Sequence, residues 1–135
     1  MFGEKVSEQA PVKQKIGESF EELRTADLII DSLSIFLHQE GKAGRSIIGK
    51  DRLKIRRESA MAAQLCLKSG TRLSGMMGVS AQSGRNPAQR HFRDLRTMST
   101  HGGIHWDNAT TPTGRYLLGI ETGDPLIDQS NSLKN

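Results

Sequence analysis

A long run of regularly spaced apolar residues constrains this chain most. Between residues 11 and 40 they recur at steps of three or four, the spacing that puts side chains on one face of an α-helix. Pro11 suits the first helical turn, where its missing N–H would have no partner, and Gly41 can adopt the left-handed conformation that ends a helix. The pattern predicts a helix of about 30 residues, from Pro11 to Glu40. Its stripe comprises Val12, Ile16, Phe20, Leu23, Ala26, Ile30, Leu33 and Leu37.

A second helix is predicted from Asp51, which can act as its N-cap, to Met77. Its inward face is rich in small residues, which let another helix approach closely. Gly70 and Gly75 weaken this helix, each by about 1 kcal/mol relative to Ala, so packing must hold it in place. The inward face carries Ile55, Ala62, Cys66, Ser69, Leu73 and Met77.

Two shorter helices are predicted further along the chain. Asn86 can cap and Pro87 can begin a helix that continues to Thr100. A last helix is predicted over residues 111–118, where Thr111-Pro112 can start it and Gly119 stops it. From Glu121 the chain is polar and is expected to fray.

The composition agrees with an all-helical domain. The chain has 135 residues, of which 35% are hydrophobic and 4% aromatic, so a core must rely on Leu, Ile, Met and Ala, which favour helices. No strand-like alternation of useful length is present. We therefore predict an all-α, up-and-down helical bundle over residues 11–119, with tails at 1–10 and 120–135. At this length the core is modest, so a large cofactor would have to be shared with another domain or subunit.

Charge and cysteine content narrow the class further. The net charge is +4, and residues of both signs are mixed along the chain. Nucleic-acid binders usually concentrate their basic residues more strongly than this chain does. The single cysteine, Cys66, excludes an internal disulfide framework and a cysteine-based zinc site. No stretch of eighteen apolar residues and no secretory signal are present. We expect a cytoplasmic protein with no membrane or nucleic-acid partner.

A polar stripe on the third predicted helix carries the candidate chemistry. Arg90, Asp94, Thr97 and His101 fall within roughly 60° of one another around the helix axis. One interpretation is a solvated face on which Asp94 pairs with Arg90. The other is a binding site, because His101 precedes two glycines that let backbone approach a flat ligand, and an imidazole titrates near neutral pH.

The segment around this stripe resembles a known family. Its features are Gln89-Arg90, Phe92-Arg93-Asp94, a histidine seven residues after that aspartate, Asp107, Gly114-Arg115 and Leu118-Gly119. The segment is similar to the C-terminal helical domain of acyl-CoA dehydrogenase-like, flavin-dependent monooxygenases. These include the oxygenase components that hydroxylate 4-hydroxyphenylacetate and secosteroid phenols, and the dibenzothiophene monooxygenases. The similarity extends over about residues 11–119.

The resemblance implies specific residue roles. His101 would face the flavin isoalloxazine and the substrate hydroxyl, either as a base or as a hydrogen-bond partner of the flavin once it has reacted with oxygen. Gly78, Ser80 and Ala81 would contact the flavin of a neighbouring subunit. Arg93 and Asp94 would form a buried or interhelical ion pair that holds the histidine helix.

The resemblance also implies partners and a limit. Reduced FMN or FAD would be the cofactor, a flavin reductase could supply it, and the substrate would be an aromatic or acyl small molecule bound by a homotetramer. The related enzymes carry an N-terminal helical domain and a central β-barrel that these residues lack. Alone, the chain is expected to bind flavin weakly and to turn over little or nothing. The alternative is a non-catalytic helical interaction or oligomerisation domain.

Other interpretations of single residues compete with this one. A zinc site at His101 and His105 is disfavoured, because Gly102-Gly103 breaks the helical geometry that two such ligands need. The basic run of residues 52–57 fits a solvated helix flank better than a nucleic-acid surface. Cys66 is predicted to be a packing residue. Trp106 fits either a substrate pocket or an anchor between helices.

Overall fold

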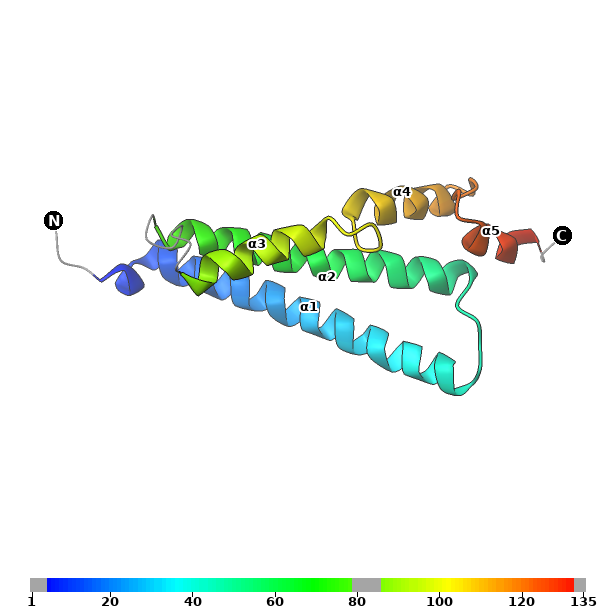
Figure 1. Ribbon diagram of the computed structural model, residues 1–135, viewed down its shortest axis with the longest axis horizontal. Coiled ribbons are helices and arrows are strands. Elements are labelled where there is room, and N and C mark those ends of the chain that lie inside the picture. The colour runs from blue at the N-terminus through cyan, green and yellow to red at the C-terminus, as the bar shows by residue number, and fades with distance from the viewer. Residues whose placement is uncertain (1–4, 79–85, 133–135) are drawn as a thin grey trace.

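The computed structural model describes residues 5–78 and 86–132, and every regular element within them is helical (Figure 1). This confirms the predicted all-α class. The elements are a short 3₁₀ helix η1 (Val6–Glu8), α1 (Ala10–Lys42), α2 (Gly49–Met76), α3 (Pro87–Ser99), α4 (Trp106–Leu117) and α5 (Pro125–Ser132).

The second helix, α2, is the centre of the fold. It packs against α1, α3, α4 and α5. Figure 1 shows α1 antiparallel along one side of α2, while α3 and α4 follow one another along the other side. α5 lies at the far end of α4 from α3. The arrangement is an open, elongated row of helices in which α1 and the α3–α4 pair flank a shared neighbour.

The first helix forms as predicted, but it buries a narrower face than its apolar stripe suggests. Ser19, Ala26 and Leu33 are buried and spaced seven residues apart, which is the spacing of a seam between two helices. Most of the stripe lies beside this seam and is exposed, because α2 covers only one side of α1. The exposed members are Ile16, Phe20, Leu23, Ile30 and Leu37. Gly44, and not Gly41, takes the left-handed conformation after the helix, with φ at 63°.

A polar cluster joins α1 to α2 within the seam. Arg72 donates from Nη1 to Glu22 Oε2 at 2.6 Å and from Nη2 to Glu22 Oε1 at 2.8 Å, a bidentate pair. Ser69, which is fully buried, donates to the same carboxylate at 2.8 Å, and Lys68 Nζ lies 2.8 Å from it. The Arg72 and Lys68 hydrogen bonds outweigh desolvation and hold the pKa of Glu22 far below its ordinary range. The seam is thus fixed by charge as well as by apolar contact.

The second helix begins earlier than predicted. Ile48 precedes its first residue without a side-chain cap, and Gly49 has φ at 57°. Asp51 lies in the first turn, where its negative charge is attracted to the positive end of the helix dipole. Further along, a Cβ on Gly70 would lie 2.5 Å from Leu95 Cδ2, so α3 approaches α2 closely because residue 70 has no side chain.

The fourth helix also begins earlier than predicted, at Trp106, and includes Pro112 in its interior. Pro112 has no N–H to donate to the carbonyl of Asn108, four residues before it. That carbonyl accepts a hydrogen bond from Arg56 Nη2 of α2 at 3.1 Å. A proline that would break an isolated helix is therefore accommodated by a neighbouring side chain.

The expectation that the chain frays after Glu121 is wrong. Residues 125–132 form α5 on α2, and Ile127 has no exposed surface. Asp124 caps this helix by accepting from Leu126 N at 3.0 Å, and it also accepts from Arg52 at 3.0 Å and Arg56 at 2.8 Å. One buried isoleucine and an aspartate with two arginine partners hold a segment that is otherwise largely polar or exposed.

Candidate functional site

His101 is exposed in a tight turn just after α3. Asn86 Oδ1 accepts from Ala88 N at 2.9 Å, so the predicted cap does begin α3, which ends at Ser99. The amide of Ile104 donates to the carbonyl of His101 at 2.9 Å and closes a turn around Gly102 and Gly103. The imidazole is therefore presented at the end of a helix, beside two residues without side chains.

Hydrogen bonds fasten this turn to the body of the domain. Asn108 Nδ2 of α4 donates to the carbonyl of Gly102 at 3.3 Å. The carbonyl of Asn108 accepts from Arg56 of α2, which also donates to Asp124 at 2.8 Å. The turn that carries His101 is thus linked through α4 and α2 to the start of α5.

The polar stripe of α3 faces away from α2. Arg90, Asp94, Thr97 and His101 are all exposed, whereas Phe92 and Leu95 are half-buried toward α2, as the helical spacing predicts. Arg90 Nε lies 3.7 Å from Asp94 Oδ2. The geometry so far matches a solvated helix face that ends in an exposed imidazole.

Arg93 and Asp94 lie close together on α3, but within the described residues their pair is neither buried nor interhelical. Arg93 Nε lies 3.8 Å from Asp94 Oδ1, and both side chains are more than half exposed on the same helix. Among the described residues neither side chain reaches a neighbouring helix, because α3 turns both away from α2. Ion pairs that join separate elements include those of Arg72 with Glu22 and of Arg56 with Asp124, which sequence spacing alone did not reveal.

The segment expected to approach a neighbour's flavin begins where the first described range ends. Gly78 is exposed with φ at 67°, a conformation suited to glycine. Ser80 and Ala81 lie outside the described residues.

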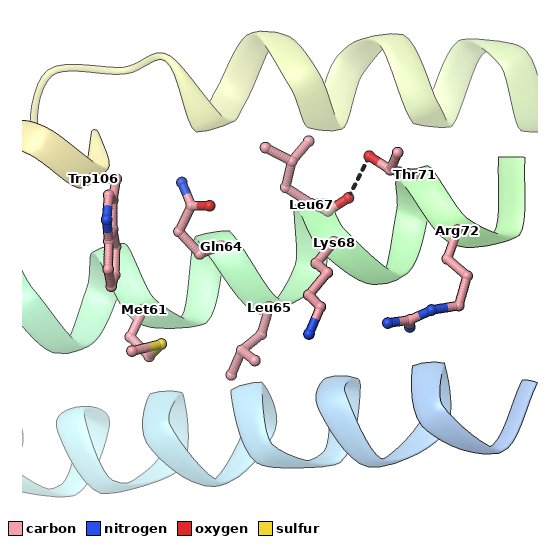
Figure 2. A pocket seen from close by; sticks show the side chains of 8 residues that line it. All are labelled: Met61, Gln64, Leu65, Leu67, Lys68, Thr71, Arg72 and Trp106. Atoms are coloured by element: carbon pink, nitrogen blue, oxygen red, sulfur yellow. Dashed lines mark hydrogen bonds between the residues drawn. The ribbon is translucent and has the colours of Figure 1, made fainter. Parts of the chain in front are cut away.

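A groove of about 770 Å³ runs along α2, and Trp106 stands at one end of it (Figure 2). In Figure 2 the indole ring lies next to Met61 of α2, with Leu65 and Lys68 further along the helix. A smaller cavity of about 260 Å³ shares Met61 and Trp106 and continues toward Ile29 of α1. Trp106 therefore both anchors α4 on α2 and lines a cavity. The predicted inward face of α2 missed this groove, because Met61 and Leu65 lie outside that stripe.

Other candidate residues take structural roles. Burial is the main cause that raises the pKa of the Cys66 thiol, which fits a packing residue. In the basic run, Arg52 and Arg56 pair with Asp124, and Lys54 lies over the ring of Phe36 at 4.8 Å. Part of this run is therefore engaged within the domain and is not simply solvated.

Two further observations concern the described part of the chain. No group of three or more His, Cys, Asp and Glu side chains gathers there in a way that could hold a metal ion. Within residues 5–78 and 86–132, every helix falls short of the length or the apolar character that crossing a bilayer requires.

Comparison with known proteins places the domain. The family described as "Acyl-CoA dehydrogenase, C-terminal domain" matches residues 1–106. The chain is 27% identical over 127 residues to the "Pigment production hydroxylase" of Rhodococcus sp. (strain ATCC 21145), covering 92% of this chain and 32% of that protein. It is 32% identical over 82 residues to the "FADH(2)-dependent resorcinol hydroxylase, oxygenase component" of Rhizobium sp. (strain MTP-10005), covering 61% of this chain and 20% of that protein.

The matches cover most of this chain but only part of each relative. The chain spans a third or less of the length of the curated relatives it matches. No solved structure matches it significantly. The family match covers most of the chain and agrees with the all-α fold, so the chain belongs to the acyl-CoA dehydrogenase C-terminal domain family.

Proposed function

We propose that this chain forms the C-terminal helical part of a flavin-dependent monooxygenase, in which His101 faces the flavin and the substrate. The observation that carries the proposal is the exposed imidazole at the end of α3, beside Gly102 and Gly103, in a turn fastened to α2 and α4. The comparisons support the proposal because both relatives whose regions match this chain are named hydroxylases.

The residues of the turn fit the edge of a flat ring. Gly102 and Gly103 have no side chains to obstruct it, and the exposed imidazole can form a hydrogen bond to an oxygen atom of a bound ligand. A bound reduced flavin would supply the electrons that activate dioxygen. Gly78, Ser80 and Ala81 are proposed to contact the flavin of a neighbouring subunit. The resorcinol hydroxylase is named as FADH₂-dependent, which favours reduced FAD over FMN.

The groove beside Trp106 suggests the substrate class. An indole ring and Met61 form an apolar wall that suits an aromatic small molecule. The resorcinol hydroxylase, whose name gives a phenol as its substrate, supports an aromatic substrate here. Since that protein is named an oxygenase component, we propose that a separate flavin reductase supplies the reduced cofactor, in the cytoplasm.

The proposal requires further protein around the domain. The chain corresponds to a third or less of its relatives, so most contacts to flavin and substrate would come from regions outside the match. We propose that the domain works in a homotetramer, binds flavin weakly alone and is inactive until those regions are supplied.

The exposed face of α1 favours a second candidate function, a non-catalytic interaction or oligomerisation domain. Phe20 is 65% exposed and Ile35 is 60% exposed, and both lie on a helix that packs mainly against α2. Apolar surface of this extent on one helix is typical of a protein interface. This function needs the α1 face but not His101.

A chimera tests the catalytic proposal. In the Rhizobium resorcinol hydroxylase, the region that corresponds to this chain would be replaced by the chain itself, and resorcinol hydroxylation would be measured with reduced flavin. His101→Ala should abolish most product formation while reduced flavin is still oxidised. Thr97→Ala, on the same exposed stripe of α3, is the matched control and should retain activity. Equal hydroxylation by the two variants would exclude a catalytic role for His101.

Anaerobic titration separates the two functions at the level of binding. Reduced FAD and FMN would be titrated into the active chimera and into its His101→Ala variant. The catalytic proposal predicts weaker flavin binding or a changed flavin spectrum in the variant. An interaction domain predicts identical titrations, together with loss of assembly when the α1 face is altered.

A further inference from the structure

The turn around His101 places a backbone N–H against one nitrogen of the imidazole ring. The backbone N–H of Gly103 donates a hydrogen bond to His101 Nδ1, with the two nitrogens 3.2 Å apart. A ring nitrogen accepts an N–H only through its lone pair, so Nδ1 is unprotonated in this arrangement. In a neutral imidazole the proton then lies on Nε2.

The other ring nitrogen, Nε2, faces solvent and can bond a ligand. His101 is exposed, and no donor or acceptor among the described residues bonds its Nε2. The ring lies over the backbone of residue 103, where a Cβ would come 3.3 Å from Nδ1 and 3.4 Å from Cε1. Residue 103 therefore matters twice, through its N–H and through its missing side chain. Gly102 differs, since a Cβ there would lie 4.0 Å from Asn108 Nδ2, an ordinary contact.

We propose that Gly103 is a positioning residue that selects the Nε2–H tautomer of His101, with this N–H directed outward to an oxygen atom of the bound flavin or substrate. This inference rests on the proposed function for the identity of the ligand, but the tautomer itself is a property of the chain alone. The tautomer decides whether the outward nitrogen acts as a base or as a hydrogen-bond donor, because an Nε2 that carries a proton cannot accept one. Accepting a proton at Nδ1 would break the Gly103 hydrogen bond.

The tautomer is measurable in the full chain without flavin. Long-range ¹H–¹⁵N correlation spectra at about pH 8.5, where ordinary histidine is neutral, report the protonation of each ring nitrogen. We expect His101 to show one fully unprotonated Nδ1 and one fully protonated Nε2. His38 is exposed on α1 and bonds none of the described residues through its ring, so it serves as the reference for an imidazole that exchanges between tautomers. Shifts of His101 equal to those of His38 would overturn the proposal.

Two glycine variants test the cause. Gly103→Ala keeps the N–H but puts a Cβ 3.3 Å from Nδ1, so the ring must shift by a few tenths of an ångström and the ¹⁵N shifts of His101 should move toward those of His38. Gly102→Ala is the matched control and should leave them unchanged. No shift in Gly103→Ala, or an equal shift in both variants, would refute the positioning role.

The result is separable from the proposed function. If His101→Ala leaves hydroxylation by the chimera intact, the proposed function fails while the tautomer measurement stands on its own. If the spectra show a mixed tautomer but His101→Ala abolishes hydroxylation, the catalytic proposal stands and the role of Gly103 is refuted.

Discussion

Arg56 supplies the hydrogen bond that Pro112 cannot give. The carbonyl of Asn108 would pair with the N–H of residue 112 in a regular helix, and it accepts instead from the Arg56 guanidinium at 3.1 Å. The same guanidinium donates to Asp124 at 2.8 Å. One side chain of α2 therefore bonds the first turn of α4 and the residue that caps α5.

Replacing Arg56 with Ala should lower the free energy of unfolding by about 1–3 kcal/mol, because a helix carbonyl and a capping carboxylate each lose a donor. Urea denaturation followed by circular dichroism measures this. Arg57→Ala is the control, since Arg57 approaches Glu58 only at 3.7 Å on the surface, and it should change stability by less than about 0.5 kcal/mol.

A double-mutant cycle tests the link to the proline. Pro112→Ala restores the missing N–H, so the Asn108 carbonyl no longer depends on Arg56. Arg56→Ala should then lower the free energy of unfolding by about 0.5–1.5 kcal/mol less in the Pro112→Ala background than in the unmodified chain. Additive effects of the two substitutions would show that the arginine does not compensate for the proline.

The two interior glycines of α2 should respond differently to alanine. A Cβ on Gly75 meets nothing within 4 Å, so Gly75→Ala should stabilise the helix by about 0.5–1 kcal/mol. A Cβ on Gly70 would meet Leu95 Cδ2 at 2.5 Å, and Leu95 must change rotamer to admit it. Gly70→Ala should therefore be less stable than Gly75→Ala by about 1–2 kcal/mol. Thermal unfolding of the pair measures the difference, which should largely vanish when Leu95→Ala removes the obstructing methyl group.

Acid should destabilise the domain through two carboxylates. Arginine and lysine hydrogen bonds lower the pKa of Glu22 from its ordinary 4.5. Burial raises the pKa of Asp124, but the Arg52 hydrogen bond, the Leu126 amide and the arginine charges outweigh it and lower the value from 3.8. Because each pKa is lower in the folded state, the stabilisation is complete above these ordinary values and is lost as the pH falls through the lowered ones.

Chemical denaturation at a series of pH values checks this dependence. Glu22→Gln should be less stable than the unmodified chain at neutral pH and should lose less stability on acidification. Glu21→Gln, on the neighbouring exposed position of α1, is the control. An identical pH dependence in all three proteins would contradict a stabilising role for the Glu22 cluster.

The exposed face of α1 predicts association of copies through that face. Phe20→Glu combined with Ile30→Glu should leave the free energy of unfolding within about 1 kcal/mol and shift the assembly toward monomer. Leu33→Ala, at a buried position of the same helix, should instead cost about 2–5 kcal/mol. Sedimentation velocity over a range of concentrations distinguishes these outcomes. An unmodified chain that is monomeric throughout, or a variant that still associates, would exclude this face as the contact.

Helices with strong local signals were predictable from the sequence. The spacing of apolar residues and Pro11 located α1 to within two residues, and the Asn86-Pro87 pair located the start of α3. These signals act within one turn of the chain, so they can be recognised without knowledge of the fold. Thr111-Pro112 misled the prediction of α4, because the compensation by Arg56 comes from another helix.

Features that depend on distant residues were not predictable. Ile127 is the buried apolar residue of a largely polar segment, and packing on α2 explains why α5 forms there. Asp124 pairs with Arg52 and Arg56 across about 70 residues of sequence. For the candidate site, the position of His101 beside two glycines was visible in the sequence, but the hydrogen bond from Gly103 that selects its tautomer required the turn geometry.

The central position of α2 has a consequence for how the chain tolerates cutting. α1 reaches the rest of the domain mainly through α2, across an exposed connection at residues 43–46 that carries no buried side chain. Two separately made pieces, one ending in that connection and one beginning there, should therefore recombine into the intact domain. A cut inside α2 should instead leave both pieces unable to fold, because each of the other long helices would lose part of the surface on which it packs.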